Sequence, residues 1–274
     1  MPALLDDSHR SNLTFVVGVG STESQCGEQL RRVREPVSRS KSGVQGKVAD
    51  VLNGRSRHAE SQNELRAFQV LMATARADAW QEQPFALDYY CEGIRHRYTP
   101  DILVTWGTRR EVVEVKEDSE ADLAENRARF TFISELLAEH GYHFRLWRKS
   151  EICAEPRLTN VHLVLRYRCV ALGAAEHERI RRAFCTVPET TLRTLCQASE
   201  TSIQTVLHLV LEGTLHIDWW EPLGLDSKVS IRPIGRAVWP CPPSLFLQNH
   251  SEEAKCHAMR CERVSRSTSG GRSS

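Results

Sequence analysis

Two carboxylates and one lysine stand on two short apolar runs that follow each other closely in the sequence. Asp101 precedes the run 102–104, and Glu114 and Lys116 end a run that begins at Glu111. Magnesium prefers oxygen ligands and keeps several waters, so two or three carboxylates are enough to hold it against a phosphate. A nearby lysine can position the attacking water or stabilise charge in the transition state. These residue types therefore fit metal-dependent hydrolysis of a phosphate ester.

The two runs are predicted to form a β-hairpin, with its turn at residues 106–109. Apolar and β-branched residues flank this turn on both sides, as is typical of paired strands. If Thr105 pairs with Arg110, antiparallel counting places Asp101 opposite Glu114. Facing carboxylates destabilise a sheet by up to about 1 kcal/mol, and burial increases that cost. A divalent cation between them would remove the repulsion.

Side-chain alternation decides which residues of the second run share the site. Successive strand residues point to opposite faces, so Glu114 and Lys116 share one face while Val113 and Val115 point toward a core. A plainer interpretation stays open, in which Asp101 ends a strand at a turn and the Glu114–Lys116 pair is solvated.

A further carboxylate, Glu64, lies near the start of a predicted helix. Apolar residues recur at helical spacing over 60–72, and Glu64 and Phe68 lie at the edge of the apolar stripe. In that position Glu64 can look toward the sheet and Asp101. Alternatively, Ser61 and Glu64 form a capping box, in which the Glu64 carboxylate reaches back to a backbone N–H.

The predicted order of elements around these residues is helix, strand, strand, strand, helix. The first strand covers 82–90, where Pro84 introduces it, and residues 91–93 form a turn into the strand of Asp101. The acidic stretch 117–122 then leads into a helix that Gly141 ends, and we interpret the stretch as a helix cap, with a second metal site as the alternative. Residues 142–147 alternate as a strand that closes a helix-flanked sheet.

Four segments of the chain carry a resemblance to a known family. They are 57–64, 82–84, 97–101 and 113–116, which read Arg-His-Ala-Glu-Ser-Gln-Asn-Glu, Glu-Gln-Pro, Arg-Tyr-Thr-Pro-Asp and Val-Glu-Val-Lys. Together they resemble the TnsA-type endonuclease subunit of heteromeric transposases, within the PD-(D/E)xK nuclease group and its restriction-enzyme-like fold. The resemblance runs from about Arg34 to Ile231.

The resemblance also implies site residues and a cofactor. The catalytic positions of the family match Glu64, Asp101, Glu114 and Lys116, and the three carboxylates would be the metal ligands. Some members have Gln at the position of Glu114, so this chain would hold a full carboxylate set. We expect Mg²⁺ as the cofactor, with Mn²⁺ able to replace it.

The expected fold class is α/β, a restriction-endonuclease-like mixed sheet flanked by helices and followed by a mostly helical winged helix-turn-helix domain. The expected parts are a disordered extension at 1–33, an endonuclease domain with a basic leading arm at 34–155, a winged-helix domain at 156–239 and a disordered tail at 240–274. Residues 31–58, Arg57 among them, hold eight basic residues against two acidic ones. The resemblance suggests that this arm touches DNA, and a solvated flexible arm is the alternative.

The C-terminal domain is expected to contain helices at 190–197 and 201–212, with wing strands at 215–219 and 228–231. The second helix would be the recognition helix if this domain read DNA. Its expected outward residues include no Arg or Lys, which argues against base reading. They are Ser202, Gln204, Thr205, His208 and Glu212. In the resembled family this region contacts a regulatory ATPase, and the lack of cations fits protein contact at least as well.

Composition sets wider limits on the class of protein. The chain has 274 residues, a net charge of +1 and 41% hydrophobic residues, which is enough for two domains with cores. A net charge near zero argues against a general polyanion binder. Nine scattered cysteines without a Cys-x-x-Cys pair indicate a reducing compartment, which we expect to be the cytoplasm. The apolar stretch 13–20 is too short to span a bilayer, so no membrane partner is expected.

The expected function is a Mg²⁺-dependent DNA endonuclease that frees one strand at each transposon end. Its expected partners are double-stranded DNA at the transposon ends, a DDE recombinase subunit that handles the other strand, and an ATPase regulator that contacts the C-terminal domain. The resemblance supplies the transposase context, and residue spacing supplies only the nuclease. Two other functions stay open: a stand-alone restriction or repair nuclease of the same fold, and a winged-helix DNA-binding regulator with an inert nuclease-like half.

Overall fold

A computed structural model describes residues 14–16, 46–50, 54–74, 77–91, 94–185 and 187–239 of the chain. The chain divides into two compact units, Met1–Arg236 and Ala237–Ser274, and every helix and strand described below belongs to the first. The predicted tail and most of the predicted extension and basic arm lie outside the described residues. Within the described ranges, no helix is long and apolar enough to cross a bilayer.

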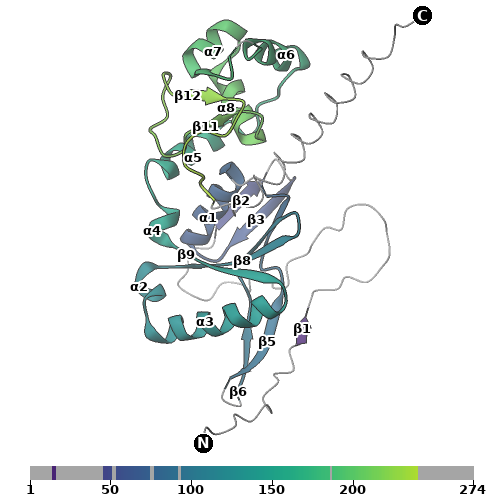
Figure 1. Ribbon diagram of the computed structural model, residues 1–274, viewed down its shortest axis with the longest axis vertical. Helices are drawn as coiled ribbons and strands as arrows, with labels where there is room; N and C mark the ends of the chain where they lie inside the picture. The colour runs from purple at the N-terminus through teal and green to yellow at the C-terminus, as the bar shows by residue number, and fades with distance from the viewer. Residues whose placement is uncertain are drawn as a thin grey trace, which may run out of the picture. The chain divides into compact units, whose positions relative to one another are not determined.

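A four-stranded mixed sheet forms the centre of the N-terminal part (Figure 1). Its strands, in spatial order, are β4 (Ala79–Glu82), β7 (Ile102–Trp106), β8 (Arg109–Lys116) and β9 (Tyr142–Arg148). The first three are antiparallel, whereas β8 and β9 are parallel. A parallel pair needs a crossover, which is supplied by α2 (Asp118–Ala121) and α3 (Ala124–Glu139). The prediction of a mixed sheet flanked by helices is confirmed.

The β7–β8 hairpin has the register that the sequence predicts. Leu103 lies opposite Val112, and Thr105 lies opposite Arg110. The two-residue turn begins at Gly107, whose φ of 53° falls in the left-handed region that glycine adopts without steric cost. Apolar alternation and one glycine are therefore enough to set this pairing.

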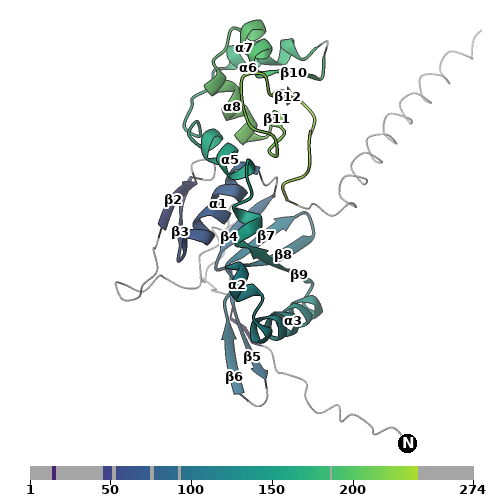
Figure 2. The ribbon, with the colours of Figure 1, turned by 90° about the vertical axis from the view of Figure 1, so that its left-hand side faces the viewer.

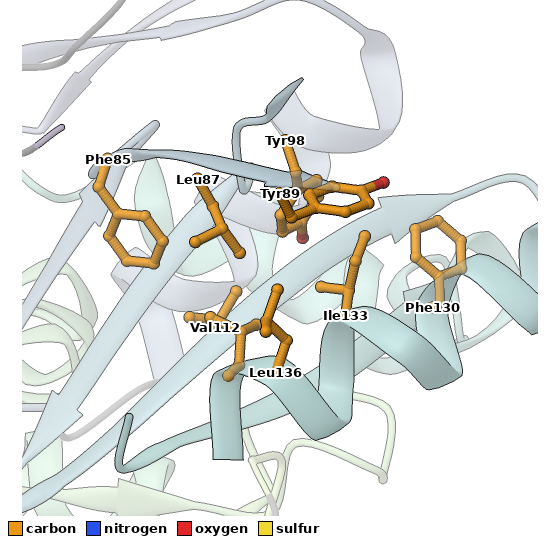
Figure 3. Close-up of a cluster of buried hydrophobic side chains, with 9 residues drawn as sticks. Phe85, Leu87, Tyr89, Tyr98, Val112, Phe130, Ile133 and Leu136 are labelled. Carbon is orange, nitrogen blue, oxygen red and sulfur yellow. The ribbon is translucent and has the colours of Figure 1, made fainter. Parts of the chain in front are cut away.

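Helices cover both faces of the central sheet. On one face, Phe130 of α3 packs in a hydrophobic cluster with Val112 of β8 (Figure 3). On the other face lies α1 (Gln62–Thr74), whose Phe68 ring contacts the Trp80 ring of β4 at a centroid distance of 5.4 Å. The sheet is thus the middle layer of three.

A second sheet has the order β1-β5-β6 and is antiparallel. Its strands are β1 (Thr14–Val16), β5 (Ala86–Cys91) and β6 (Ile94–Tyr98). Leu87, Tyr89 and Tyr98 from β5 and β6 join the cluster that α3 covers (Figure 3). Because β1 falls inside the predicted extension at 1–33, at least three residues of that extension form a strand.

The predicted order of one helix, three strands and one helix is incomplete. The strand expected at 82–90 corresponds to β5, and only its first residue, Glu82, belongs to β4, which is an additional strand. The two strands are separate because the chain turns at Gln83, which has a φ of 44°, and at Pro84, which has no N–H to donate. The turn expected at 91–93 leads into β6 and not directly into the strand after Asp101. β6 escaped prediction because four of its five residues are exposed and show no apolar alternation.

A separate antiparallel hairpin joins β2 (Gly46–Asp50) to β3 (Arg55–Ala59) and contacts α1. Gly54, with a φ of 64°, precedes β3. Part of the predicted basic arm is therefore folded against α1.

The C-terminal part of the first unit combines helices with a small antiparallel sheet (Figure 2). Its helices are α4 (Lys149–Ile152), α5 (Arg157–Leu165), α6 (Ala174–Ala183), α7 (Leu192–Ser199) and α8 (Ile203–Glu212). The strands are β10 (Glu189–Thr191), β12 (Lys228–Ser230) and β11 (His216–Ile217), in that spatial order. The two helices and two wing strands named above are present, and this part also contains α4, α5, α6 and β10. The assignment as a winged helix stays a prediction.

α8 exposes fewer residues than the sequence predicts for a recognition helix. Thr205 and His208 were expected to point outward, but they are only 3% and 6% exposed. Nδ1 of His208 lies 3.0 Å from the carbonyl oxygen of Tyr167. The reason is that α8 packs against α1, α5 and α7, so its buried surface is wider than one helical stripe.

Candidate active site

The β7–β8 hairpin brings together three of the predicted site residues, Asp101, Glu114 and Lys116. Asp101 immediately precedes β7, and continuing the register places it opposite Glu114. Oδ2 of Asp101 accepts a hydrogen bond of 2.7 Å from the N–H of Val115, and Nζ of Lys116 forms an ion pair of 2.9 Å with Oε1 of Glu114. Strand alternation puts Glu114 and Lys116 on the face of Val112, so the site lies on the α3 side of the sheet.

Glu114 has a second partner, Tyr98, which the sequence analysis did not assign to the site. The hydroxyl of Tyr98, at the end of β6, donates a hydrogen bond of 2.9 Å to Oε2 of Glu114. Burial, and then the charges of Glu114 and Asp101, raise the pKa of Tyr98 well above its usual value, so the hydroxyl stays a donor. A tyrosine three residues before Asp101 is a usable signal, because a buried tyrosine hydroxyl usually has a hydrogen-bond partner.

The carboxylates of the site repel one another. Burial raises the pKa of Asp101 well above its usual value of 3.8, and the charges of Glu114 and Glu64 raise it further. Burial lowers the pKa of Lys116, but the attraction of Glu114 and Asp101 outweighs burial, so the net pKa of Lys116 is raised. Lys116 is therefore held as a cation that faces three carboxylates.

Glu64 forms the capping box that the sequence analysis left as an alternative. Oγ of Ser61 and the N–H of Glu60 donate to the two carboxylate oxygens of Glu64, each at 2.9 Å. The N–H of Glu64 donates in return to Oγ of Ser61 at 3.2 Å. Burial raises the pKa of Glu64, whereas the charge of Lys116 acts to lower it, so the carboxylate lies within electrostatic reach of the lysine. Glu64 is thus a cap, and its role as a metal ligand stays a prediction.

Hydrogen bonds across the fold join the start of α1 to the β7–β8 hairpin. Nδ2 of Asn63 donates to Oε1 of Glu117, the residue that follows β8, at 2.9 Å. The N–H of Gln83 donates to the carbonyl oxygen of Asp101 at 2.9 Å, and Nε2 of Gln83 donates to Oε1 of Glu60 at 2.9 Å. No local sequence pattern indicates these positioning roles, because the bonds join residues that are far apart in the chain.

Arg57 differs from what the predicted basic arm implies. Only 2% of the residue is exposed, and its Nε and Nη2 donate to Oδ2 of Asp50 at 3.0 and 2.8 Å. Its Nη1 donates to Oε2 of Glu82 at 2.9 Å, and its Cζ lies 3.7 Å from the centroid of the Trp80 ring. Arg57 is therefore not available to DNA, because its charge is already neutralised inside the fold.

Comparison with known proteins agrees with this geometry. Residues 76–148 match the family described as TnsA-like endonuclease N terminal. These residues form a TnsA-like endonuclease domain. The matched stretch of the TnsA-like domain runs from β4 to β9 and contains Asp101, Glu114 and Lys116. The match supports a TnsA-like endonuclease. No curated protein matches the chain.

The TnsA-like domain offers oxygen donors that suit a metal ion. The hairpin places Asp101 and Glu114 on one face, and a divalent cation would relieve their repulsion. Over the described ranges, no three His, Cys, Asp or Glu side chains gather into a group that could hold a metal ion. The carboxylate of Glu64 is engaged in its helix cap. The donor chemistry fits Mg²⁺ at the two hairpin carboxylates, and the set of three stays a prediction.

Proposed function

We propose that this chain is the Mg²⁺-dependent DNA endonuclease subunit of a cut-and-paste heteromeric transposase, and that it hydrolyses one DNA strand at each transposon end. The observation that carries the proposal is the pairing of Asp101 with Glu114 on one face of a TnsA-like domain, with Lys116 beside them. One lysine does not balance the carboxylates that raise the pKa of Asp101. Surplus negative charge in a buried place favours a bound cation.

Asp101 and Glu114 would hold the ion, with Glu64 as the third carboxylate and Mn²⁺ able to replace Mg²⁺. When bound, the ion would polarise the scissile phosphate and lower the pKa of a coordinated water. Lys116 keeps its proton and places positive charge where negative charge grows on the phosphate oxygens. Tyr98 fixes the orientation of Glu114 through Oε2, and a backbone N–H fixes Asp101 through Oδ2.

The proposed protein partners are a DDE recombinase, which would cut the other strand, and an ATPase regulator, which would bind the C-terminal part. The predicted outward residues of α8 that are exposed, Ser202, Gln204 and Glu212, carry no positive charge. Arg193 of α7 is paired with Asp226 at 2.9 Å. A surface of this kind suits a protein partner at least as well as DNA.

The test of the proposed function is strand cleavage of transposon-end DNA by the full chain together with its recombinase partner. We expect nicking with Mg²⁺ or Mn²⁺, and no nicking when a chelator removes both. Asp101→Ala should abolish nicking without unfolding the protein, because the change removes a ligand and relieves repulsion instead of opening a core cavity. Wild-type-like nicking by a folded Asp101→Ala protein would refute the proposal.

A second aspartate serves as the matched control for this experiment. Asp226 lies in an exposed ion pair with Arg193, outside the TnsA-like domain. Asp226→Ala should therefore nick DNA like the wild type. Genes for a DDE recombinase and an ATPase next to the gene for this chain would favour the transposase subunit over a stand-alone restriction or repair nuclease.

A further inference from the structure

One arginine on α3, Arg129, differs from the other cations near it. α3, β9 and α4 carry five Arg and Lys residues, and four of them form ion pairs. These pairs are Arg127 with Asp122, Arg145 with Glu111, Arg148 with Asp122 and Lys149 with Glu117. The fifth cation, Arg129, is exposed and forms no ion pair with any residue that the structure describes.

Arg129 also lies beside the candidate active site. Its Cζ is 5.9 Å from the centroid of the Tyr98 ring, and the Tyr98 hydroxyl contacts Glu114 at 2.9 Å. The neighbouring residue Phe130 packs in the same cluster as Tyr98 (Figure 3). Glu114 and Lys116 project on this α3 side of the sheet, so Arg129 and the candidate site share one face.

We propose that Arg129 binds a phosphate of the DNA backbone close to the scissile one and so positions the strand over Asp101 and Glu114. This inference rests on the proposed nuclease function and names one contact of its substrate. The guanidinium fork matches the oxygens of a phosphate, and among the described residues no acidic side chain pairs with it. A positive charge at this place also offsets the repulsion between an acidic site and a polyanion.

Strand β6 supplies an internal comparison for this proposal. Tyr98 points toward α3, as its place in the cluster shows. Arg97 directly precedes it and therefore points to the opposite face of the strand. Arg97 is also exposed and also forms no ion pair with a described residue. If any exposed arginine without an ion pair could bind DNA equally well, Arg97 and Arg129 would contribute equally to binding. We expect only Arg129 to contact the phosphate.

The test is DNA binding by the full chain without divalent metal, so that binding is measured apart from cleavage. Fluorescence anisotropy with a labelled duplex, at salt concentrations from about 50 to 200 mM, gives the slope of log K against log salt concentration. Arg129→Gln should weaken binding to all sequences and reduce the slope by about 0.9, the value for one phosphate contact. Arg129→Lys keeps the charge and should keep the slope.

Two other arginines serve as controls. Arg127→Gln removes an exposed arginine of the same helix that is already paired with Asp122. Arg97→Gln removes an exposed arginine without an ion pair from the opposite face of β6. Each control should change the slope by less than about half of the change caused by Arg129→Gln.

Three results would overturn the inference: an unchanged slope in Arg129→Gln, equal losses in all three Gln variants, or no measurable binding by the wild type. The proposed function would survive these results if nicking still required Asp101. Conversely, nicking by the Asp101→Ala protein would overturn the proposed function while leaving a selective effect of Arg129 on binding in place.

Discussion

Arg57 is the centre of a buried charge cluster whose charges are used within the fold. Its guanidinium donates to Asp50, to Glu82 and to the carbonyl oxygen of Trp80, and it lies over the Trp80 ring. Both acidic partners are buried as well. This cluster joins the β2–β3 hairpin to β4, and the hydrogen bonds of its guanidinium go to groups within the protein.

The cluster around Lys116 lies in the same part of the chain and is balanced differently. Lys116 pairs with Glu114, while Asp101 and Glu64 add negative charge that no further cation in the described part of the site offsets. Glu114 is buried, whereas Asp101, Lys116 and Glu64 are half-buried. In the Arg57 cluster, cation and carboxylates neutralise one another. In the Lys116 cluster, the carboxylates outnumber the lysine, and the surplus negative charge could attract a bound cation.

Removal of the Arg57 guanidinium from its buried cluster should have the largest effect on stability. Arg57→Met removes the guanidinium that pairs with the buried carboxylates of Asp50 and Glu82, and we expect a loss of about 3–5 kcal/mol in the free energy of unfolding. Urea denaturation measures this loss. Arg193→Met, which breaks an exposed pair with Asp226, should change stability little. Equal losses in both variants would show that the buried pairs of Arg57 stabilise the fold no more than an exposed ion pair does.

Removal of the Lys116 ammonium group from its cluster should instead slow DNA cleavage. Lys116→Met should slow nicking by roughly 10²–10³-fold, because a positive charge next to the transition state is lost. Single-turnover nicking rates at saturating Mg²⁺ measure the effect. Lys149→Met removes another lysine, paired with Glu117 at 3.1 Å, and should leave the rate unchanged. If Lys116→Met nicks DNA at a rate close to that of the wild type, the ion pair of Lys116 with Glu114 is purely structural.

Glu64 tests whether one residue serves both as a cap and as part of the site. Glu64→Gln can still accept hydrogen bonds from Ser61 and Glu60, so the melting temperature should hardly change, while nicking should fall roughly 10–100-fold. Ser61→Ala should do the opposite, with a loss of about 1 kcal/mol in stability and normal nicking. Full activity of Glu64→Gln would leave only the hairpin carboxylates for the metal.

The smallest expected effect is a difference between the wild type and Asp101→Asn in how stability depends on pH. In the metal-free protein the pKa of Asp101 is raised above 3.8, so the folded state binds more protons than the unfolded state above that pH. Stability should therefore fall as pH rises from 3.8 through the raised pKa of the folded state. Asp101→Asn should remove this part of the fall in melting temperature, leaving the contribution of Glu64, which has the same sign. An identical fall in melting temperature in the wild type and in Asp101→Asn would show that burial and the neighbouring carboxylates do not raise the pKa of Asp101.

Local patterns in the sequence were enough to predict the elements that carry the site. The register of β7 and β8 follows from alternation around Gly107, and the capping box follows from Ser61 and Glu64. Each of these features depends on residues a few positions apart, where turn chemistry and side-chain period act directly. The same rules failed for β6, because its exposed and charged residues show no such period.

The sequence by itself determined the residue types and spacing, and hence the chemistry of Asp101, Glu114 and Lys116. Only the tertiary structure decided which charges are balanced. Arg57 belongs to a basic stretch of the sequence, but the fold brings it to Glu82, 25 residues away. Tyr98 reaches Glu114 across 16 residues in the same way. Such contacts depend on how strands and helices pack against one another, and no periodicity along the chain encodes them.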